Sequence, residues 1–493
     1  MENTYIKEKN MDRRTYINGL IYIFAKALKE TYPKALLTVN YQLSDAMFCE
    51  IDNMNVTEEM ISKITSRMYE IVNSNLEIKK INMTKEEAEE FYKKEKTLRG
   101  IIQLDCKEKE FVTLYYCEDY YDYYMGNLPE KTGSLKIFKL ESYEKGILIH
   151  YPSKEKPNEL SEYKYQNLLM KSLKDYEKLH KKLNIDTVYK LNQEVENDKA
   201  TSCILMDESL HEKRISDLAD EIVKNKKVKL VLIAGPSSSG KTTFAHRLGI
   251  ALKINGIKPV TLSVDNYFVE REQTPIDEFG NYDFECIEAI DLKLFNKHLL
   301  KLLAGEEVEI PSFDFENGHK RFRGDKLKLK SNEVLIIEGI HCLNDRLTDS
   351  VSNDKKYKIY ISDLTVLNMD YHNRISTTDT RLIRRIVRDS KFRHYTASHT
   401  LKMWYSVNRG EEKYIFPFQE EADSMFNSSL IYELGVLKKH AEPLLKQIKE
   451  NEPEYAEAQR LLEILQYFKE IPSNRVPENS LLREFIGGGV FKL

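Results

Sequence analysis

One segment limits the fold of this chain more than any other: KLVLIAGPSSSGKTTFAHRLGIALKIN, residues 229–255. Its apolar run predicts a buried strand, the pattern G-x-x-x-x-G-K-[ST] follows from Gly235 to Thr242, and the remainder has the pattern of a helix. In this order, glycines allow backbone N–H groups to surround an anion, and the helix N-terminus adds its positive end. The sequence therefore predicts an α/β domain with a loop that holds nucleotide phosphates.

The residues expected to contact the nucleotide follow from this loop. Lys241 would reach the β- and γ-phosphates, and the hydroxyl of Thr242 would bind Mg²⁺. The alternative is a serine-rich loop that matches the pattern by chance, and the strand before it and the helix after it argue against that. The full predicted set is Gly235, Pro236, Ser237, Ser238, Ser239, Gly240, Lys241, Thr242 and Thr243.

The segments around the loop indicate which kind of nucleotide-binding protein this is. KLVLIAG, KPVTLSVD, EVLIIEG and YKIYIS alternate with helical stretches, as in a mostly parallel sheet covered by helices. A GTPase needs a guanine-reading [NT]-K-x-D, which is absent after Lys241. Motor-type ATPases usually end their second acidic strand in Asp-Glu, whereas EVLIIEG ends in the single acid Glu338 followed by glycine. These features favour a kinase for small molecules.

Such a kinase needs a general base beside the acceptor hydroxyl. KPVTLSVD ends in Asp265, at the strand end where parallel sheets bind ligands. A carboxylate there can accept or align the hydroxyl proton during transfer. The alternative role for Asp265 is an Asx-type cap that closes the strand, and the neighbouring phosphate loop favours the base.

The segment TTDTRLIRRIVRD predicts a helix with arginines along one face. Arginine pairs bidentately with phosphate oxygens, so we expect this face to stabilise the transferring charge. The alternative is a solvated basic face bridged to Asp379 and Asp389. The four arginines stand at i, i+3, i+4 and i+7: Arg381, Arg384, Arg385 and Arg388.

Five motifs in this order resemble the uridine kinase/phosphoribulokinase family: SVDNYF, NYDFECIEAID, PSFDF, VLIIEGI and DTRLIRRIVRD. The resemblance covers residues of about 228 to 430. It implies an ATP- and Mg²⁺-dependent kinase, most similar to nucleoside kinases that form a 5′-phosphate. It also implies that Asp265 is the catalytic aspartate, that Asp283 holds sugar hydroxyls and that Glu338 lies near magnesium.

The acceptor pocket departs from the uridine kinase pattern. Phe268 and Phe315 match pocket aromatics around the nucleoside, but Phe313 stands where uridine kinases carry a tyrosine. His319 lies one residue later than the histidine that reads the base. A different insert, KFRHYTASHTLKMWYSVNRGEEKYIFPFQEEAD, follows the arginines, and we hypothesise that it shapes a different acceptor pocket. Trp404 within it is interpreted as core packing.

The first 150 residues mix helical and strand patterns, and they resemble the second additional domain of threonyl-tRNA synthetases, which edits mischarged tRNA. The resemblance rests on FAKALKETYP, VTEEMISKI, MYEIVNSNLEIKKINMTKEEAEEFY and YCEDYYDYYMGNLPEKTGSLKIFKL. Asn18 and Tyr22 stand at the positions of the two editing histidines, Cys117 is kept, and Tyr121 replaces the last histidine. We predict neither editing nor a metal here, and interpret Cys117 as a buried strand thiol. For the tyrosine cluster YYCEDYYDYY a structural role is favoured over base stacking, because its acids would repel phosphate.

Length and composition complete the organisation. The 493 residues divide into an α+β domain resembling the synthetase editing domain (1–150), a helical connector (151–225), a P-loop kinase domain (226–430) and a helical C-terminal segment (431–493).

Six scattered cysteines without a CxxC pair indicate reduced thiols in a cytoplasmic protein. A net charge of −4 leaves no footprint for nucleic acid or membrane, so we expect a small-molecule partner and leave the oligomeric state open. The second hypothesis is an RNA- or tRNA-linked regulator with an ATP-driven switch.

Overall fold

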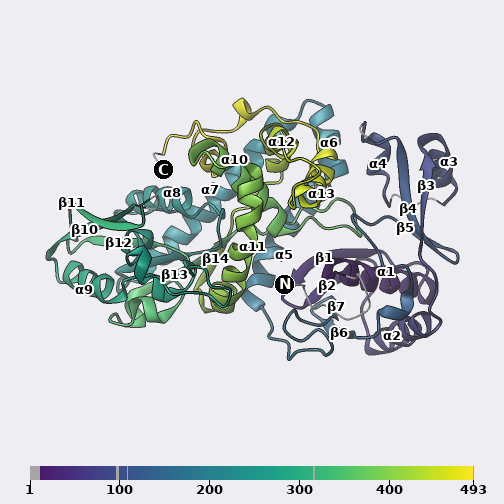
Figure 1. The fold of residues 1–493 in the computed structure, drawn as a ribbon, viewed down its shortest axis with the longest axis horizontal. Coiled ribbons are helices and arrows are strands. Elements are labelled where there is room, and N and C mark those ends of the chain that lie inside the picture. Colours follow the sequence, from purple (N-terminus) through teal and green to yellow (C-terminus); the bar gives the residue numbers. More distant parts are fainter. Residues whose placement is uncertain (1–11, 96–98, 108, 315–316, 492–493) are drawn as a thin grey trace.

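The computed structural model describes residues 12–95, 99–107, 109–314 and 317–491. The parallel sheet lies towards one end of an elongated molecule, and the helices and strands of the N-terminal part lie towards the other end (Figure 1). The C-terminal helices α12 (Glu433–Leu445) and α13 (Tyr455–Gln466) lie between these two parts.

The phosphate loop follows the central strand of a five-stranded sheet, at the carboxyl end of that strand. The strands are all parallel and have the order β14-β13-β8-β12-β9, which confirms the expected mostly parallel sheet. The central strand has an entirely buried apolar sequence, because helices cover both of its faces. The strands are β8 (Leu230–Ala234), β9 (Lys258–Ser263), β12 (Glu333–Glu338), β13 (Lys356–Ser362) and β14 (Ser424–Asn427).

Four helices and one hairpin complete the kinase part. The helices are α8 (Lys241–Ile254), α9 (Leu292–Leu303), α10 (Thr377–Phe392) and α11 (Ala397–Tyr414). The antiparallel hairpin β10 (Glu307–Asp314) and β11 (His319–Lys328) was not predicted from the sequence. Helix α10 carries the arginine face, and α11 is formed by the insert that follows it.

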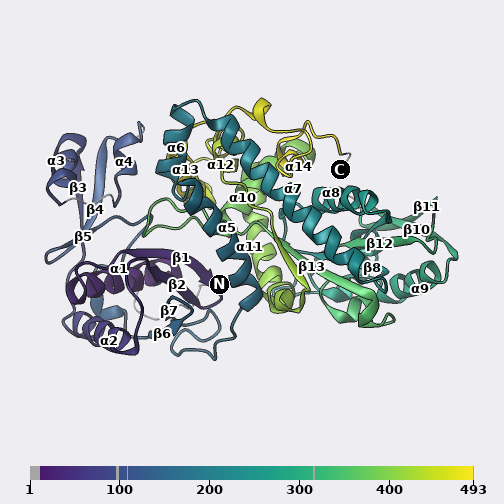
Figure 2. The same cartoon turned by 180° about the vertical axis from the view of Figure 1, so that it is seen from behind.

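Three helices precede the kinase sheet: α5 (Asn167–Leu183), α6 (Val188–Glu196) and α7 (Ala200–Lys224). The helical prediction for this zone, residues 151–225, agrees with the structure from residue 167 onward, whereas residues 151–166 form no helix. Helix α7 packs on the kinase sheet, since Ile215 and Ile222 share a buried apolar cluster with Val231 and Phe244. Figure 2 shows α7 running beside α8 and the sheet, so the zone expected to connect two domains also covers one of them.

The C-terminal residues form α12, α13 and the short α14 (Arg483–Ile486), which confirms the helical prediction. They pack against α10, because Leu382 and Ile386 share one buried cluster with Leu437, Leu461 and Phe485. The arginine helix therefore has an apolar side enclosed by the C-terminal segment.

The N-terminal part is an α+β region with two antiparallel sheets, in the orders β1-β2-β7-β6 and β3-β4-β5. Its helices are α1 (Arg13–Thr31), α2 (Glu58–Asn73), α3 (Lys85–Glu95) and α4 (Ile102–Asp105). Its strands are β1 (Leu37–Leu43), β2 (Ala46–Ile51), β3 (Lys79–Thr84), β4 (Phe111–Cys117), β5 (Tyr120–Asp122), β6 (Lys139–Tyr143) and β7 (Gly146–His150).

One strand prediction in this part is wrong in position. The apolar pattern of LKIFKL, residues 135–140, predicts a strand, but β6 begins only at Lys139. The backbone N–H of Leu135 instead closes a short 3₁₀ turn on the carbonyl of Thr132 at 3.1 Å. Leu135 and Phe138 are buried, so their apolar character serves the core and not a strand.

Among the described residues, no helix is long and apolar enough to cross a membrane.

Candidate active site

The phosphate loop joins β8 to α8, and two of its glycines are required by geometry. A Cβ on Gly235 would lie 1.9 Å from the backbone carbonyl oxygen of Ile361 on β13. Gly240 has a φ of +83°, in the left-handed region that favours glycine. The loop can therefore curl tightly at the end of the strand only with glycine at these positions.

The polar groups of the loop suit a polyphosphate. The hydroxyls of Ser238 and Ser239 are buried, and neither has a hydrogen-bond partner within the part of the chain that the structure describes. Lys241 Nζ donates to the carbonyl oxygens of Gly235 and Pro236 at 3.0 and 3.1 Å, so its ammonium group lies across the loop. Orphaned hydroxyls, backbone N–H groups and a lysine form the donor set that phosphate oxygens require.

Asp265 and Glu338 follow two neighbouring strands at the same edge of the sheet. Glu338 ends β12 and pairs in register with Ser263 of β9, and Asp265 lies in the 3₁₀ turn directly after that strand. Asp265 is open to solvent, yet many protein atoms surround its carboxylate, and this desolvation raises its pKa while Lys241 opposes the rise. Burial and the charge of Asp265 raise the pKa of Glu338 to about 7. Two neighbouring carboxylates suit Mg²⁺, which prefers oxygen ligands.

The arginines of α10 face the protein interior, and the structure gives each of them a defined partner. Arg381, Arg384 and Arg385 are buried, which rules out a solvated face for these three. Arg381 donates two hydrogen bonds to Glu411, at 2.6 and 2.8 Å, and one to the carbonyl oxygen of Ser237 at 3.1 Å. Arg385 donates to the hydroxyl of Ser237 at 2.7 Å. Two of the four arginines thus contact the third residue of the phosphate loop.

The other two arginines have acidic partners. Arg384 donates to Glu433 at 2.5 Å and to the Ser428 carbonyl oxygen at 2.8 Å, and reaches the Ser238 carbonyl oxygen only at 3.4 Å. Arg388 donates to Asp389 at 2.8 Å. Arg381 and Arg385 contact Ser237 of the loop, and Arg384 reaches Ser238 at a longer distance. The expectation that all four arginines face phosphate stays a prediction.

On the acceptor side, Asp283 lies in a loop that contacts the insert. Its Oδ2 accepts a hydrogen bond from the hydroxyl of Tyr414, the last residue of α11, at 2.8 Å. Phe268 and Phe313 face each other with ring centroids 5.4 Å apart. His319 is exposed at the start of β11, where its Nδ1 lies 2.8 Å from Glu270. The predicted pocket residue Phe315 lies outside the described residues.

Sequence reasoning missed three acids and one tyrosine hydroxyl of this region. The backbone N–H of Ser237 donates to Glu411 at 2.8 Å, and Glu484 of α14 accepts from both the N–H and the hydroxyl of Thr243 at 3.2 and 2.9 Å. Glu285 is the third missed acid, and burial together with the charge of Glu411 raises its pKa to about 7. Tyr414 supplies the hydroxyl. Glu285 lies within the motif NYDFECIEAID, whereas Glu411, Glu484 and Tyr414 belong to no motif, and only the fold brings these three to this region.

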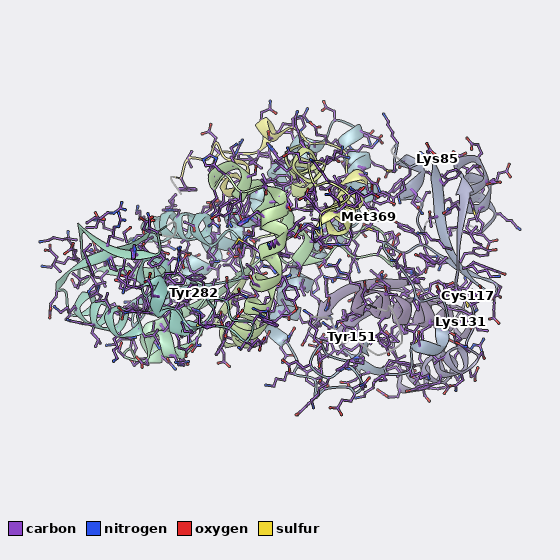
Figure 3. The ribbon with its side chains drawn as sticks, viewed as in Figure 1. Lys85, Cys117, Lys131, Tyr151, Tyr282 and Met369 are labelled. Carbon is purple, nitrogen blue, oxygen red and sulfur yellow. The ribbon has the colours of Figure 1, made fainter. Side chains whose placement is uncertain are left out.

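The insert and the positions that were compared with the editing residues also have defined surroundings. Trp404 is buried, and its ring lies 5.4 Å from the Arg381 guanidinium, which confirms core packing. In the N-terminal part, the hydroxyl of Tyr22 donates to the carbonyl oxygen of Tyr120 at 3.2 Å, and Cys117 is a buried strand thiol as predicted. Figure 3 labels Cys117 and shows it far from Tyr282, the residue before Asp283.

Comparison with known proteins shows which family has a sequence similar to that of this part of the chain. Residues 230–431 match the model of the Phosphoribulokinase / Uridine kinase family. A uridine kinase of Borrelia turicatae is 33% identical over 199 residues, which are 40% of this chain and 84% of that protein. A second one, from Borrelia duttonii, is 31% identical over 197 residues, again 40% of this chain and 84% of that protein. A uridine kinase of Halobacterium salinarum is 28% identical and covers 39% of this chain and 76% of that protein.

The fold and the loop define a P-loop kinase, an enzyme that transfers a phosphoryl group from ATP. The chain belongs to the phosphoribulokinase/uridine kinase family, and its kinase part begins at β8 and ends after β14.

Proposed function

We propose that this enzyme is a Mg²⁺-dependent nucleoside kinase that forms a 5′-phosphate. The observation that carries the proposal is that Asp265 follows β9 at the same end of the sheet at which Lys241 follows β8, where the charge of Lys241 opposes the rise in the pKa of Asp265. A general base must lie next to the group that holds the transferring phosphate.

The donor half uses the residues of the loop. Lys241 and the loop N–H groups hold the triphosphate, while Thr242 and Glu338 hold Mg²⁺ directly or through water. When bound, the ion neutralises charge that develops on the phosphate oxygens. Arg381 and Arg385 stabilise the transferring group, for which their contacts with Ser237 are the support.

In the transfer step, the acceptor oxygen forms a bond to the γ-phosphorus, and the bond from that phosphorus to the bridging oxygen of ADP breaks. Asp265 accepts or aligns the proton of the acceptor hydroxyl, so that the products are ADP and a phosphate ester. Asp265 is exposed to solvent, so an acceptor hydroxyl can approach it.

Asp283 and the aromatic residues form the acceptor half. Asp283 orients sugar hydroxyls, and the Tyr414 hydroxyl fixes the direction of its carboxylate. Phe268, Phe313 and His319 surround the base, while Phe315, which was predicted to join them, lies outside the described residues. Phe313 offers no hydrogen bond to a base, and a site without such a contact discriminates weakly through that position. The contribution of Tyr414 supports the hypothesis that the insert shapes a distinct acceptor pocket.

For the N-terminal part we propose a synthetase-editing-like domain that no longer edits. Tyrosines fill the region of the former catalytic side chains, where the rings of Tyr22 and Tyr120 meet edge to face at 5.3 Å. Its role in the enzyme is then structural or ligand-binding.

A panel of nucleosides, sugar phosphates and related alcohols with ATP tests the proposed function through ADP release. We expect at least one nucleoside to be phosphorylated at a rate well above that of ATP hydrolysis without acceptor. The proposal is overturned if none of the alcohols is phosphorylated. Asp265→Asn is expected to lower kcat by about 10²–10⁴-fold, the usual contribution of a general base, with the Kd for ATP nearly unchanged. Retained turnover in this variant would remove Asp265 as the base.

A further inference from the structure

Two carboxylates from distant parts of the chain occupy hydrogen-bond donors of the phosphate loop. Glu411 of α11 accepts from the backbone N–H of Ser237 at 2.8 Å. Glu484 of α14 accepts from the N–H of Thr243 at 3.2 Å and from its hydroxyl at 2.9 Å. These donors lie at the start of the loop and in the first turn of α8, on the two sides of Lys241.

Such donors are the groups with which a helix N-terminus binds phosphate oxygens. A carboxylate and a phosphate carry the same sign of charge, and one N–H group donates well to only one of them. We propose that Glu484 and Glu411 are internal counter-anions of the phosphate loop, which compete with the phosphates of the nucleotide and thereby set its affinity.

The surroundings of Glu484 allow its side chain to leave while the backbone stays in place. Leu481 is fully buried against Gly240, where an added Cβ would lie 2.6 Å from the leucine side chain. Arg483 donates to the carbonyl oxygens of Ser473 and Gly487, each at 3.1 Å, which fixes the turn around α14. Glu484 itself is only half-buried, so its carboxylate can rotate into solvent when a phosphate replaces it.

Glu411 is held differently, because its carboxylate is buried and pairs with Arg381. A phosphate that takes the Ser237 N–H from Glu411 also offers Arg381 a new bidentate partner. The guanidinium therefore exchanges a carboxylate for a phosphate without being left unpaired. This exchange links nucleotide binding to α11, the helix whose last residue contacts Asp283.

Calorimetric titration of the full chain with ADP and Mg²⁺ tests the proposal, and it needs no acceptor. Glu484→Gln keeps the shape of the side chain and removes its charge, and we expect the Kd for ADP to fall about tenfold. Tenfold corresponds to about 1.4 kcal/mol, which is close to the contribution of one hydrogen bond to a charged group. Glu478→Gln is the matched control, since Glu478 is an exposed glutamate of the same segment, and its Kd should equal that of the wild type.

A Kd that stays unchanged or rises in Glu484→Gln overturns the proposal for Glu484. Glu411→Gln, with its folding checked by the fluorescence of Trp404, is expected to bind ADP more tightly as well. Equal or weaker binding by this variant in its folded state overturns the proposal for Glu411. Because only nucleotide binding is measured, these outcomes do not depend on which acceptor the enzyme uses.

Discussion

The ion pair of Arg381 and Glu411 allows the structural and catalytic roles of the arginine helix to be separated. Both side chains are only 1% exposed, so removal of one partner leaves an uncompensated charge in the interior. We expect Arg381→Met or Glu411→Gln alone to lower the free energy of unfolding by about 3–5 kcal/mol. The double variant has neither charge, and the amide oxygen of the introduced glutamine still accepts from the Ser237 N–H. It should therefore be more stable than either single variant by about 2 kcal/mol or more.

Urea unfolding of the three variants provides the measurement. Trp404 is the single tryptophan, and its ring lies 5.4 Å from Arg381, so its fluorescence follows unfolding around the pair. Phosphoryl transfer should remain lost in the stable double variant, because Arg381 is absent from the phosphate site. Additive costs, or single costs below about 1 kcal/mol as in exposed pairs, would refute the buried pair. Transfer restored together with stability would refute the catalytic role of Arg381.

Three further substitutions have defined outcomes. Gly235→Ala should weaken ADP binding at least about tenfold by calorimetry, because its Cβ would lie 1.9 Å from the Ile361 carbonyl oxygen and the loop must shift; unchanged binding would contradict this. Thr57→Ala removes an N-cap bond to α2, at 3.2 Å, and should cost about 1 kcal/mol in urea unfolding; no loss would refute the cap. Tyr414→Phe should raise the acceptor KM several-fold and leave the Kd for ATP unchanged; the reverse pattern would refute its acceptor role.

The parts of the fold that follow from local pattern were predictable. The apolar run before Gly235 predicts a buried strand, and the glycines after it predict the phosphate loop, because both depend on residues near in sequence. Asp265 and Glu338 were predicted as site residues in the same way, since Glu338 ends one strand and Asp265 follows another at the same edge of the sheet.

The contacts around the loop could not be predicted from local pattern. Glu484 lies 241 residues after its partner Thr243, and a four-residue helix with one glutamate has no signature of its own. Spacing placed the arginines of α10 on one face, but their partners depend on how α11 and α12 pack against that face. Residues 135–138 show a related limit, because apolar residues that serve a turn and a core look like those of a strand.

Transfer of the γ-phosphoryl group of labelled ATP to a nucleoside is the most direct test of the proposed reaction. The full chain is incubated with Mg²⁺, γ-labelled ATP and each common nucleoside, and the products are separated and identified. We expect the label in a nucleoside 5′-monophosphate with the wild type and none in that product with Asp265→Asn. Label found only in inorganic phosphate for every nucleoside, or equal transfer by Asp265→Asn, would contradict the mechanism.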